Sequence, residues 1–271
     1  NFREKTLDNP NPVNEVESPA GHIQSLEKGL RILDEIIEAP APLKLADIVR
    51  RFNMDRASAF RFLQTLEHRG FLRKDATTKE YDVGGRIYYW ASRLREKTRL
   101  IDSFHEQLQR LASITQQTTH LGLFVNDRVL LADFALSDSI ISIRHCIGVL
   151  EPLYSSAVGK AVLAFLPVER REALINNIEF VRLTGNTIMN ADALRIDLAI
   201  TRDRGYAIDA NETHEGLTCI ARPIFGKDGV PVASIGITCV TALVSAEPGR
   251  FEHLIQSIQA MGSEITTNLA I

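Results

Sequence analysis

The residues with the most suggestive chemistry are histidines and cysteines in the second half of the chain, and their spacing suits neither catalysis nor metal binding. His120, His145 and His214 lie near Cys146 or Cys219 in the sequence, but no pair has the spacing of metal ligands. Isolated histidines are more often satisfied core or surface residues, which leaves a metal in a pocket as the lesser alternative. The motifs H-E-x-x-H and G-x-S-x-G do not occur in the sequence.

The pair Gly159-Lys160 invites comparison with a phosphate-binding loop. Such a loop needs a glycine five positions before Gly159 and a serine or threonine after the lysine, but Tyr154 and Ala161 stand there. No nucleophile and base can be paired from the sequence, so we predict that the protein is not an enzyme and uses no cofactor. An enzyme with an accessory helical domain is the alternative from a different class.

Basic residues are the second chemical signal, because they gather in one segment. The net charge is -3, yet the segment from Lys44 to Arg99 has 14 Lys and Arg against 7 Asp and Glu, while the remainder has 17 against 27. A cationic segment on an acidic body predicts contact with a polyanion such as nucleic acid. A solvated helical face with ordinary surface arginines is the alternative explanation.

Length and composition limit the fold. A chain of 271 residues suits two domains, and 45% hydrophobic residues predict a buried core. Three cysteines are too few for a disulfide framework or a four-cysteine zinc site, which favours a reducing, cytoplasmic compartment. No apolar run is long enough to cross a membrane. Residues 1–22 contain three prolines and no apolar block, which predicts a disordered tail and not a secretory signal.

Short helices must position the basic residues. Apolar residues at helical spacing predict a first helix from Ser25, its proposed cap, to the proline-rich residues 39–42. The same pattern predicts helices over residues 44–52 and 56–68, the last ending at Gly70. Residues 71–73 and 79–83 are expected to form a hairpin. Helices followed by a hairpin make a winged helix-turn-helix, assigned to residues 23–86.

The third helix is predicted to enter the major groove of DNA by its N-terminal end, while Phe60, Leu63 and Leu66 hold it to the core. Arginine and serine side chains can reach base edges or phosphates, and lysines on the wing can reach phosphates or the minor groove. The expected DNA-binding residues are Arg50, Arg51, Arg56, Ala57, Ser58, Ala59, Arg61, Arg73, Lys74 and Lys79. A winged-helix adaptor for proteins is a further alternative, which the surplus of basic residues disfavours.

The rest of the chain has a mixed pattern. Residues 87–100 are predicted to form a linker helix, and residues 101–271 a second domain that opens with a helix over 101–114. The expected strands cover residues 120–125, 129–134, 140–146, 206–209, 218–225 and 232–240. The expected helices cover residues 156–166, 168–176, 190–204 and 248–269. Antiparallel strands flanked by helices predict an α+β fold class.

Several segments resemble IclR-type bacterial transcription regulators. In the first domain they are residues 25–33 (SLEKGLRIL), 45–48 (LADI), 58–66 (SAFRFLQTL) and 70–72 (GFL). In the second they are residues 154–164 (YSSAVGKAVLA), 204–209 (RGYAID) and 215–221 (EGLTCIA). One departure is Ser58, where the family often has threonine. The resemblance implies dimerisation through the first domain and linker, and a GAF-like effector-binding domain with a pocket for a small organic acid.

A small acid needs N–H donors, hydroxyls and an apolar wall. Residues 157–159 begin a predicted helix, whose N–H groups and dipole favour an anion. With the positions that the resemblance implies, the expected effector residues are Ala157, Val158, Gly159, Asp209, Leu217, Cys219, Gly236 and Thr238. For Asp209 a structural hydrogen bond, and for Cys219 plain burial, are the alternatives.

Position 236 bears on the size of the expected acid. Relatives that bind glyoxylate-like acids often have a serine where Gly236 stands. The resemblance therefore implies a larger and less polar pocket in this chain, which favours an aromatic or otherwise larger acid.

Together these observations predict a sequence-specific DNA-binding transcriptional regulator of a catabolic operon, acting as repressor or activator under control of a small organic acid. The expected partners are double-stranded operator DNA, the acid, and further copies of the chain in a homodimer or homotetramer. No membrane partner and no metal are expected.

Overall fold

The computed structural model describes residues 23–97, 99–139 and 141–270, so the predicted tail over residues 1–22 lies outside the described residues. The chain divides into two compact units, Asn1–Arg99 and Leu100–Ile271. Among the described helices, even α10 (Arg250–Ala270) lacks the unbroken apolar length that a bilayer crossing requires.

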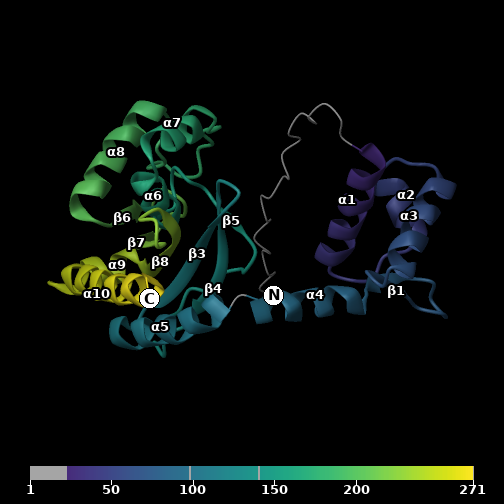
Figure 1. Ribbon diagram of the computed structural model, residues 1–271, viewed down its shortest axis with the longest axis horizontal. Coiled ribbons are helices and arrows are strands. Elements are labelled where there is room, and N and C mark those ends of the chain that lie inside the picture. The colour runs from purple at the N-terminus through teal and green to yellow at the C-terminus, as the bar shows by residue number, and fades with distance from the viewer. Residues whose placement is uncertain (1–22, 98, 140, 271) are drawn as a thin grey trace. The chain divides into compact units, whose positions relative to one another are not determined.

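The first unit is a winged helix-turn-helix (Figure 1). Its elements are α1 (Gln24–Glu38), α2 (Leu45–Arg51), α3 (Arg56–His68), β1 (Leu72–Lys74), β2 (Tyr81–Val83) and α4 (Gly85–Lys97). Strands β1 and β2 pair antiparallel and form the wing. The predicted helix-turn-helix and hairpin are confirmed, but Ile23 and not Ser25 precedes the first turn of α1.

Local chemistry sets the ends of α3. The carboxylate of Asp55 accepts a hydrogen bond of 2.8 Å from the N–H of Ser58, which caps the first turn and lowers the pKa of Asp55. At the other end Gly70 has a φ of 76°, a left-handed conformation that glycine adopts without strain. The helix therefore begins and ends where the sequence pattern predicts.

Two predictions about α3 packing are wrong. Phe60, expected in the core, is 39% exposed, whereas Ala59, expected to face DNA, is fully buried. The buried stripe of the helix runs through Ala59 and Leu63, four residues apart, and Phe60 lies about 100° further round the helix. The ring of Phe60 instead lies 5.9 Å from the ammonium group of Lys74 on the wing.

The predicted apolar face of α1 is only partly in the core. Ile32, Leu33 and Ile36 are buried in the first unit, whereas Leu26 and Leu30 are exposed. Helix α4 also exposes large side chains, although Trp90 keeps an edge-to-face contact with Phe71 at 4.7 Å.

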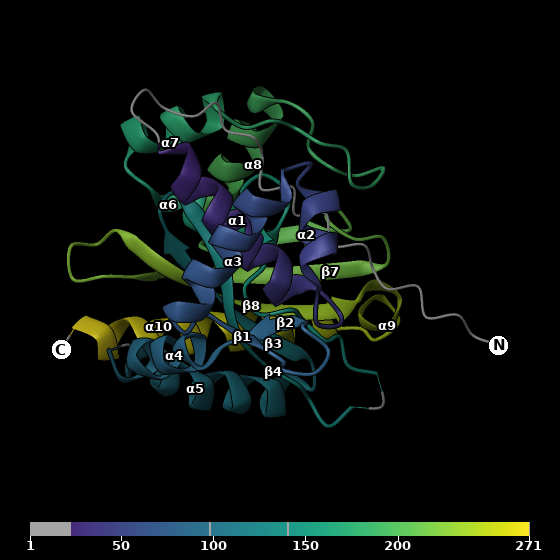
Figure 2. The same cartoon turned by 90° about the vertical axis from the view of Figure 1, so that its right-hand side faces the viewer.

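The second unit is built on an antiparallel sheet with strand order β5-β4-β3-β8-β7-β6 (Figures 1 and 2). Its strands are β3 (Thr118–Val125), β4 (Arg128–Ala135), β5 (Leu150–Glu151), β6 (Ala207–Ala210), β7 (Leu217–Phe225) and β8 (Pro231–Val240). Its helices are α5 (Arg99–Thr115), α6 (Ala157–Phe165), α7 (Val168–Asn176), α8 (Ala191–Arg204), α9 (Thr241–Ser245) and α10. This arrangement confirms the predicted α+β class.

Helices cover both faces of this sheet, as Figures 1 and 2 show. Leu121 and Ile237 belong to the core under α5 and α10, while Ala207 and Ala221 belong to the core under α6, α7 and α8. Because successive side chains of a strand alternate between faces, His120 and Thr238 lie on the α6 face.

The strand predicted over residues 140–146 is wrong. Residues 141–146 have no strand structure, and β5 forms later, where Leu150 pairs with Leu130. Ile143 donates its N–H to the side-chain hydroxyl of Thr118 at 3.1 Å. This hydrogen bond takes the place of one that a neighbouring strand would otherwise accept from the same N–H group. The short helix α9 was missed because five residues carry too little periodicity.

The close packing of the wing onto α4 gives a stability prediction. A Cβ at Gly84 would meet the carbonyl oxygen of Gly70 and lie 2.8 Å from the backbone of Leu72, whereas a Cβ at Gly85 meets nothing within 4 Å. We expect Gly84→Ala to destabilise the first unit by about 1–3 kcal/mol. Urea unfolding followed by the fluorescence of Trp90, the sole tryptophan, measures this unit. Gly85→Ala is the matched control, and equal midpoints for the two variants would contradict the prediction.

Candidate functional site

A cationic groove lies between α2, the start of α3 and the wing. It has a volume of about 740 Å³, and its described lining side chains are either positively charged or uncharged. The cations are Lys44, Arg56, Lys74 and Lys79. Among the described residues Arg56 has no ion-pair partner, so its guanidinium can bind a phosphate or base edge without breaking a contact.

The exposed side of α3 carries Ala57, Arg61 and Gln64. Arg61 donates to the hydroxyl of Ser58 at 3.2 Å, a weak contact that an incoming phosphate can replace. Gln64 was missed by the sequence analysis, although it stands three positions after Arg61 on the same helical face. A glutamine amide can pair with adenine, and an exposed ring such as that of Phe60 can contact a thymine methyl group.

The remaining expected DNA-binding residues divide into three kinds. Arg50 and Arg51 are exposed but paired, with Asp47 at 2.9 Å and with Glu35 respectively. Arg73 pairs with Asp82 across the wing, and Lys79 donates to the carbonyl of Ala76 at 2.6 Å. Exposed pairs of this kind contribute little free energy and can exchange for phosphates. Ala59 is buried and is removed from the interface, because it cannot reach DNA.

Three of the expected effector residues meet on the α6 face of the second sheet. Asp209 of β6 is opposite Cys219 of β7, which is opposite Thr238 of β8. The Cys219 thiol lies 3.4 Å from the Thr238 hydroxyl. Leu217, two residues before Cys219, is on the same face and half-buried. The register of the strands, and not nearness in sequence, brings these side chains together.

Two histidines that the sequence analysis treated as isolated join this cluster. His120 is opposite Gly236 in the β3–β8 pairing, and the rings of His120 and His145 lie 4.5 Å apart. The hydroxyl of Thr238 is 3.3 Å from Nδ1 of His120 and 3.0 Å from Nε2 of His145. The alternation of β3, with Leu121 in the apolar core, is the signal that identifies the face of His120.

The histidine pair corrects the expectation of a larger pocket at Gly236. A Cβ at Gly236 would lie 2.5 Å from Cε1 of His120, so the imidazole already fills the space that a side chain would need. The missing serine is thus replaced by a polar ring and not by empty volume.

Burial sets the charge state of the cluster. Burial lowers the pKa of His120 well below its usual value, and burial with the nearby charge of His214 lowers the pKa of His145 to about 4. Burial and the neighbouring Asp209 raise the pKa of Glu151 to about 7, and burial raises the pKa of Asp209. At neutral pH the imidazoles are therefore uncharged, and the carboxyl groups hold protons more tightly than in water.

The N-terminal turn of α6 is tied to the same cluster. The Thr213 hydroxyl donates to Ser155 Oγ at 3.3 Å, while the N–H of Thr213 donates to Asp209 at 3.2 Å. Gly159 is less available than predicted, because its N–H already donates to the capping hydroxyl of Ser156 at 3.1 Å. Ala157 and Val158 are each 1% exposed, so an acid reaches their N–H groups only after local opening.

Lys160 is fully buried, and two carboxylates pair with its ammonium group. Its ammonium group donates to Glu212 at 2.6 Å and lies 3.3 Å from Asp197. The backbone N–H of Glu212 in turn donates to Asp209 at 2.6 Å. Lys160 therefore holds the loop that positions Asp209, which agrees with the rejection of a phosphate-binding loop.

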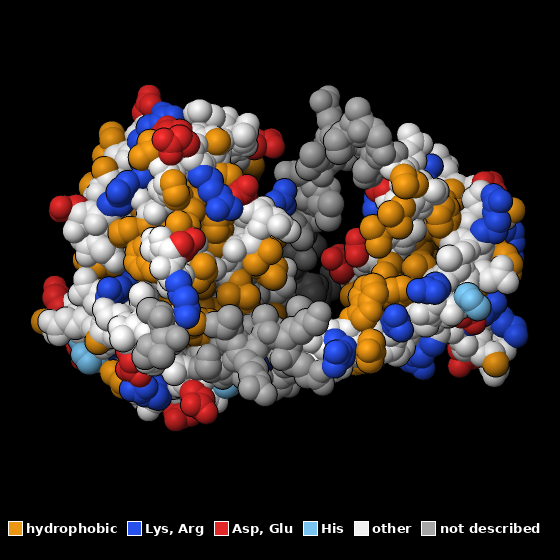
Figure 3. All heavy atoms as spheres, viewed as in Figure 1, with side chains coloured by type: hydrophobic (Ala, Val, Ile, Leu, Met, Phe, Trp, Pro, Cys, Tyr) orange, Lys and Arg blue, Asp and Glu red, His pale blue; other side chains and the backbone are white. Residues whose placement is uncertain are grey.

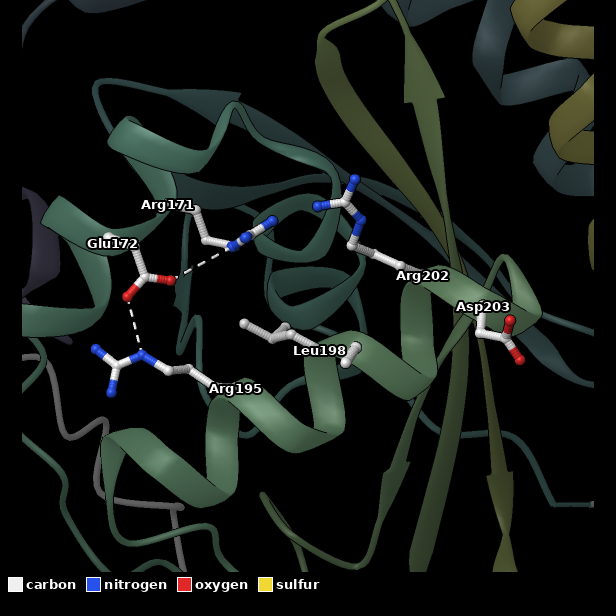
Figure 4. Close-up of a pocket in the computed structure, with 7 residues that line it drawn as sticks. Arg171, Glu172, Arg195, Leu198, Arg202 and Asp203 are labelled. Carbon is white, nitrogen blue, oxygen red and sulfur yellow. Dashed lines mark hydrogen bonds and ion pairs between the residues drawn. The ribbon is translucent and has the colours of Figure 1, made fainter.

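Two cavities of the second unit differ in their relation to this cluster. A cavity of about 330 Å³ is lined by Thr238 together with apolar side chains such as Ile141 and Ile143. A groove of about 620 Å³ between α7 and α8 contains none of the expected effector residues (Figure 4). There Glu172 bridges Arg171 at 3.7 Å and Arg195 at 2.9 Å, while Arg202 and Asp203 lie outside this bridge.

Within the described residues, no three His, Cys, Asp or Glu side chains are arranged to hold a metal ion.

A winged helix-turn-helix with a cationic groove, joined to an α+β unit, defines a DNA-binding transcriptional regulator. Comparison of the sequence with protein families agrees. The family description "Bacterial transcriptional regulator IclR C-terminal" matches residues 93–267, and "IclR helix-turn-helix domain" matches residues 25–76. The chain belongs to the IclR family of bacterial transcriptional regulators.

Individual relatives support this assignment. The glycerol operon regulatory protein of Streptomyces coelicolor is 31% identical over 92% of this chain and 98% of its own length. The Thermotoga maritima IclR, known from a crystal structure, is 29% identical in sequence. The two structures superimpose with a TM-score of 0.76 over 92% of this chain and 100% of that chain. An IclR homologue from Microbacterium hydrocarbonoxydans, crystallised with 4-hydroxybenzoate, shares the fold at 22% identity, with a TM-score of 0.73 over 90% of this chain and 98% of that one. The family assignment weighs against the enzyme alternative.

The contact between position 236 and His120 gives a second prediction. We expect Gly236→Ala to lower the stability of the second unit by about 1–3 kcal/mol, because the new methyl group must displace a buried ring. Adding His120→Ala removes the clash, so the double variant should be more stable than the two single effects predict. Thermal unfolding by circular dichroism measures both. Gly185→Ala, where a Cβ meets nothing within 4 Å, is the control. Strict additivity would contradict the packing argument.

Proposed function

We propose that this regulator controls a catabolic operon by binding operator DNA with its first unit and a small organic acid with its second. The observation that carries the DNA-binding part is the cationic groove beside the exposed face of α3. The name of the glycerol operon regulatory protein, a relative along nearly its whole length, supports control of a catabolic operon.

In this proposal α3 lies in the major groove and the wing follows the backbone. Arg56, Ala57 and Ser58 are the base-edge candidates at the start of the helix, and Arg61 lies further along the same exposed side. The phosphate candidates are Arg50, Arg51, Arg73, Lys74 and Lys79. Lys44 and Gln64 are added to the interface from the geometry of the groove and helix.

We further propose that two copies pair through their first units, either in a homodimer or within a homotetramer. Large apolar side chains gather over α1 and near the start of α4 (Figure 3). The exposed ones of these two helices and the residue before α1 include Ile23, Leu26, Leu30, Tyr88, Tyr89 and Trp90. A patch of this kind is costly in water and is typical of protein interfaces. Paired heads suit two operator half-sites.

The acid is proposed to bind at the cluster of Asp209, Cys219 and Thr238, with Ala157 and Val158 offering N–H groups. The expected residues Gly159, Leu217 and Gly236 shape this site by packing. The complex of the Microbacterium homologue with 4-hydroxybenzoate supports the class of ligand, although that homologue shares only the fold. Control of transcription requires that the acid bind two states of the regulator with different affinity.

The DNA-binding proposal predicts the effect of removing two exposed cations of α3. We expect Arg56→Ala with Arg61→Ala to weaken operator binding at least about tenfold and to reduce the dependence of log K on log salt by about 1 to 2. Fluorescence anisotropy with a promoter fragment at several salt concentrations measures both quantities. Footprinting should show two protected half-sites.

The control for this experiment is Arg182→Ala, which removes an exposed arginine from the second unit. It should leave affinity and salt dependence unchanged. Equal binding by the α3 double variant and the wild type would remove α3 from the interface.

The effector proposal predicts that Thr238→Val, which removes a hydroxyl and keeps the shape, weakens acid binding. A lost hydrogen bond to a charged group costs about 1.5–3 kcal/mol, or about 10- to 100-fold in Kd. Calorimetric titration with benzoate, 4-hydroxybenzoate, pyruvate and glyoxylate measures the affinity. Thr267→Val, on the exposed side of α10, is the control. An unchanged Kd in the Thr238 variant would exclude this residue from the site.

A further inference from the structure

We propose that the organic acid enters its site together with a proton, and that the neighbouring pair His120–His145 takes up this proton. The inference rests on the proposed function, because it assumes that an acid binds at the Thr238 cluster. It adds that the regulator responds to the acid and to pH jointly.

The first argument is the charge balance around the site. A carboxylate brings one negative charge into a buried cluster that already contains Asp209 and Glu151. The buried cation nearby, Lys160, is committed to Glu212 and Asp197. An unpaired buried charge is costly, so the incoming anion needs a compensating positive charge. A proton supplies this charge without breaking the Lys160 pairs.

The second argument is the geometry of the histidine pair. His120 fills the space over Gly236, and both rings contact the single hydroxyl of Thr238. A threonine hydroxyl has one proton to donate, so it cannot donate to both rings at once. The second nitrogen of His120, Nε2, packs against Gly236, whereas His145 meets Thr238 through Nε2 and keeps Nδ1 for another partner, in a half-buried segment. His145 is therefore placed to bind a carboxylate through its Nδ1–H once the pair is protonated.

The groups that compete for the proton come from several elements. His145 has Arg144 and Cys146 as chain neighbours, and His214 acts on it from the loop before β7. The other titratable groups of the cluster are Glu151 on β5, Asp209 on β6 and Cys219 on β7. Burial keeps the Cys219 thiol protonated, since its pKa is raised well above the usual value. Glu151, with a pKa of about 7, is the main competitor as proton acceptor.

The direction of the pH effect follows from linkage. In the free protein burial lowers the pKa of both imidazoles, to about 4 for His145. A bound carboxylate raises the imidazole pKa in the complex. Between the free and bound pKa values binding takes up a proton, so affinity falls as pH rises, by up to about tenfold per pH unit for one proton. Above the bound pKa the affinity no longer depends on pH.

The test is isothermal titration calorimetry of the full chain with benzoate, 4-hydroxybenzoate, pyruvate and glyoxylate. The acid that binds most tightly is then titrated at pH 6, 7 and 8 in buffers of different ionisation enthalpy, which gives the number of protons taken up. We expect an uptake approaching about one proton at the lower pH and a Kd that rises with pH.

Variants identify the acceptor. His145→Gln changes a residue outside the helices and strands. This variant should bind the acid more weakly than the wild type and should lose most of the proton uptake and of the pH dependence. Glu151→Gln should keep the uptake. His253→Gln, an exposed histidine on α10, is the matched control and should behave as wild type.

The possible failures are distinguishable. Acid binding without proton uptake would overturn the inference and leave the proposed function intact. Uptake that survives in His145→Gln and disappears in Glu151→Gln would overturn the assignment to the histidine pair. Binding of none of the four acids would overturn effector control as proposed, and the proton coupling with it.

Discussion

The antiparallel pairing of β3 with β8 is the constraint on which the second unit depends. It joins residues that lie 110 to 120 positions apart in the chain and fixes His120 over Gly236 and beside Thr238. Because side chains alternate across a strand, the same register sends Leu121 and Ile237 into the opposite core. A slip of one residue would exchange the polar and apolar faces, so core formation and assembly of the polar cluster are one event.

The two units treat charge in opposite ways. In the first unit Arg56 is exposed with no ion-pair partner among the described residues, and Arg50 and Arg51 hold surface pairs of low free energy. In the second unit Lys160 is buried with its partners, and the imidazoles near it are neutral. The exposed cations can exchange solvent ions for phosphates at little cost, whereas the buried cluster changes charge only when a ligand or a proton enters.

The sequence was sufficient for the elements whose signals are local. The helix expected over residues 56–68 ends before Gly70 as predicted. The strands expected over residues 120–125 and 129–134 are joined by Asn126 and Asp127, both with positive φ, and the helix expected over residues 190–204 ends at Gly205 in a left-handed conformation. Local periodicity was enough to predict these boundaries, because each boundary is set by neighbouring residues. The polar cluster was predicted in another way, since the family resemblance pointed to Asp209, Cys219 and Thr238.

Features that depend on distant contacts were not predictable in the same way. Ala59 and Phe60 were exchanged between core and surface, because a helix of 13 residues shows its buried stripe only once its neighbours are known. The segment over residues 141–146 alternates like a strand but is bonded by the Thr118 side chain. His120 and His145 were separated by 25 positions in the sequence, and only the sheet register and a turn bring their rings together.

The overlap of His120 with position 236 changes what a single residue says about ligand choice. A side chain at position 236 and the ring of His120 compete for the same volume, so a serine at 236 fits only where the ring shifts or a smaller residue replaces it. A serine at position 236 offers a hydroxyl, which is neutral at any physiological pH. Glycine at 236 with His120 beside it offers an imidazole, which can become a cation. The residue at position 236 therefore bears more on the charge that the site can supply than on the room that it leaves for the acid.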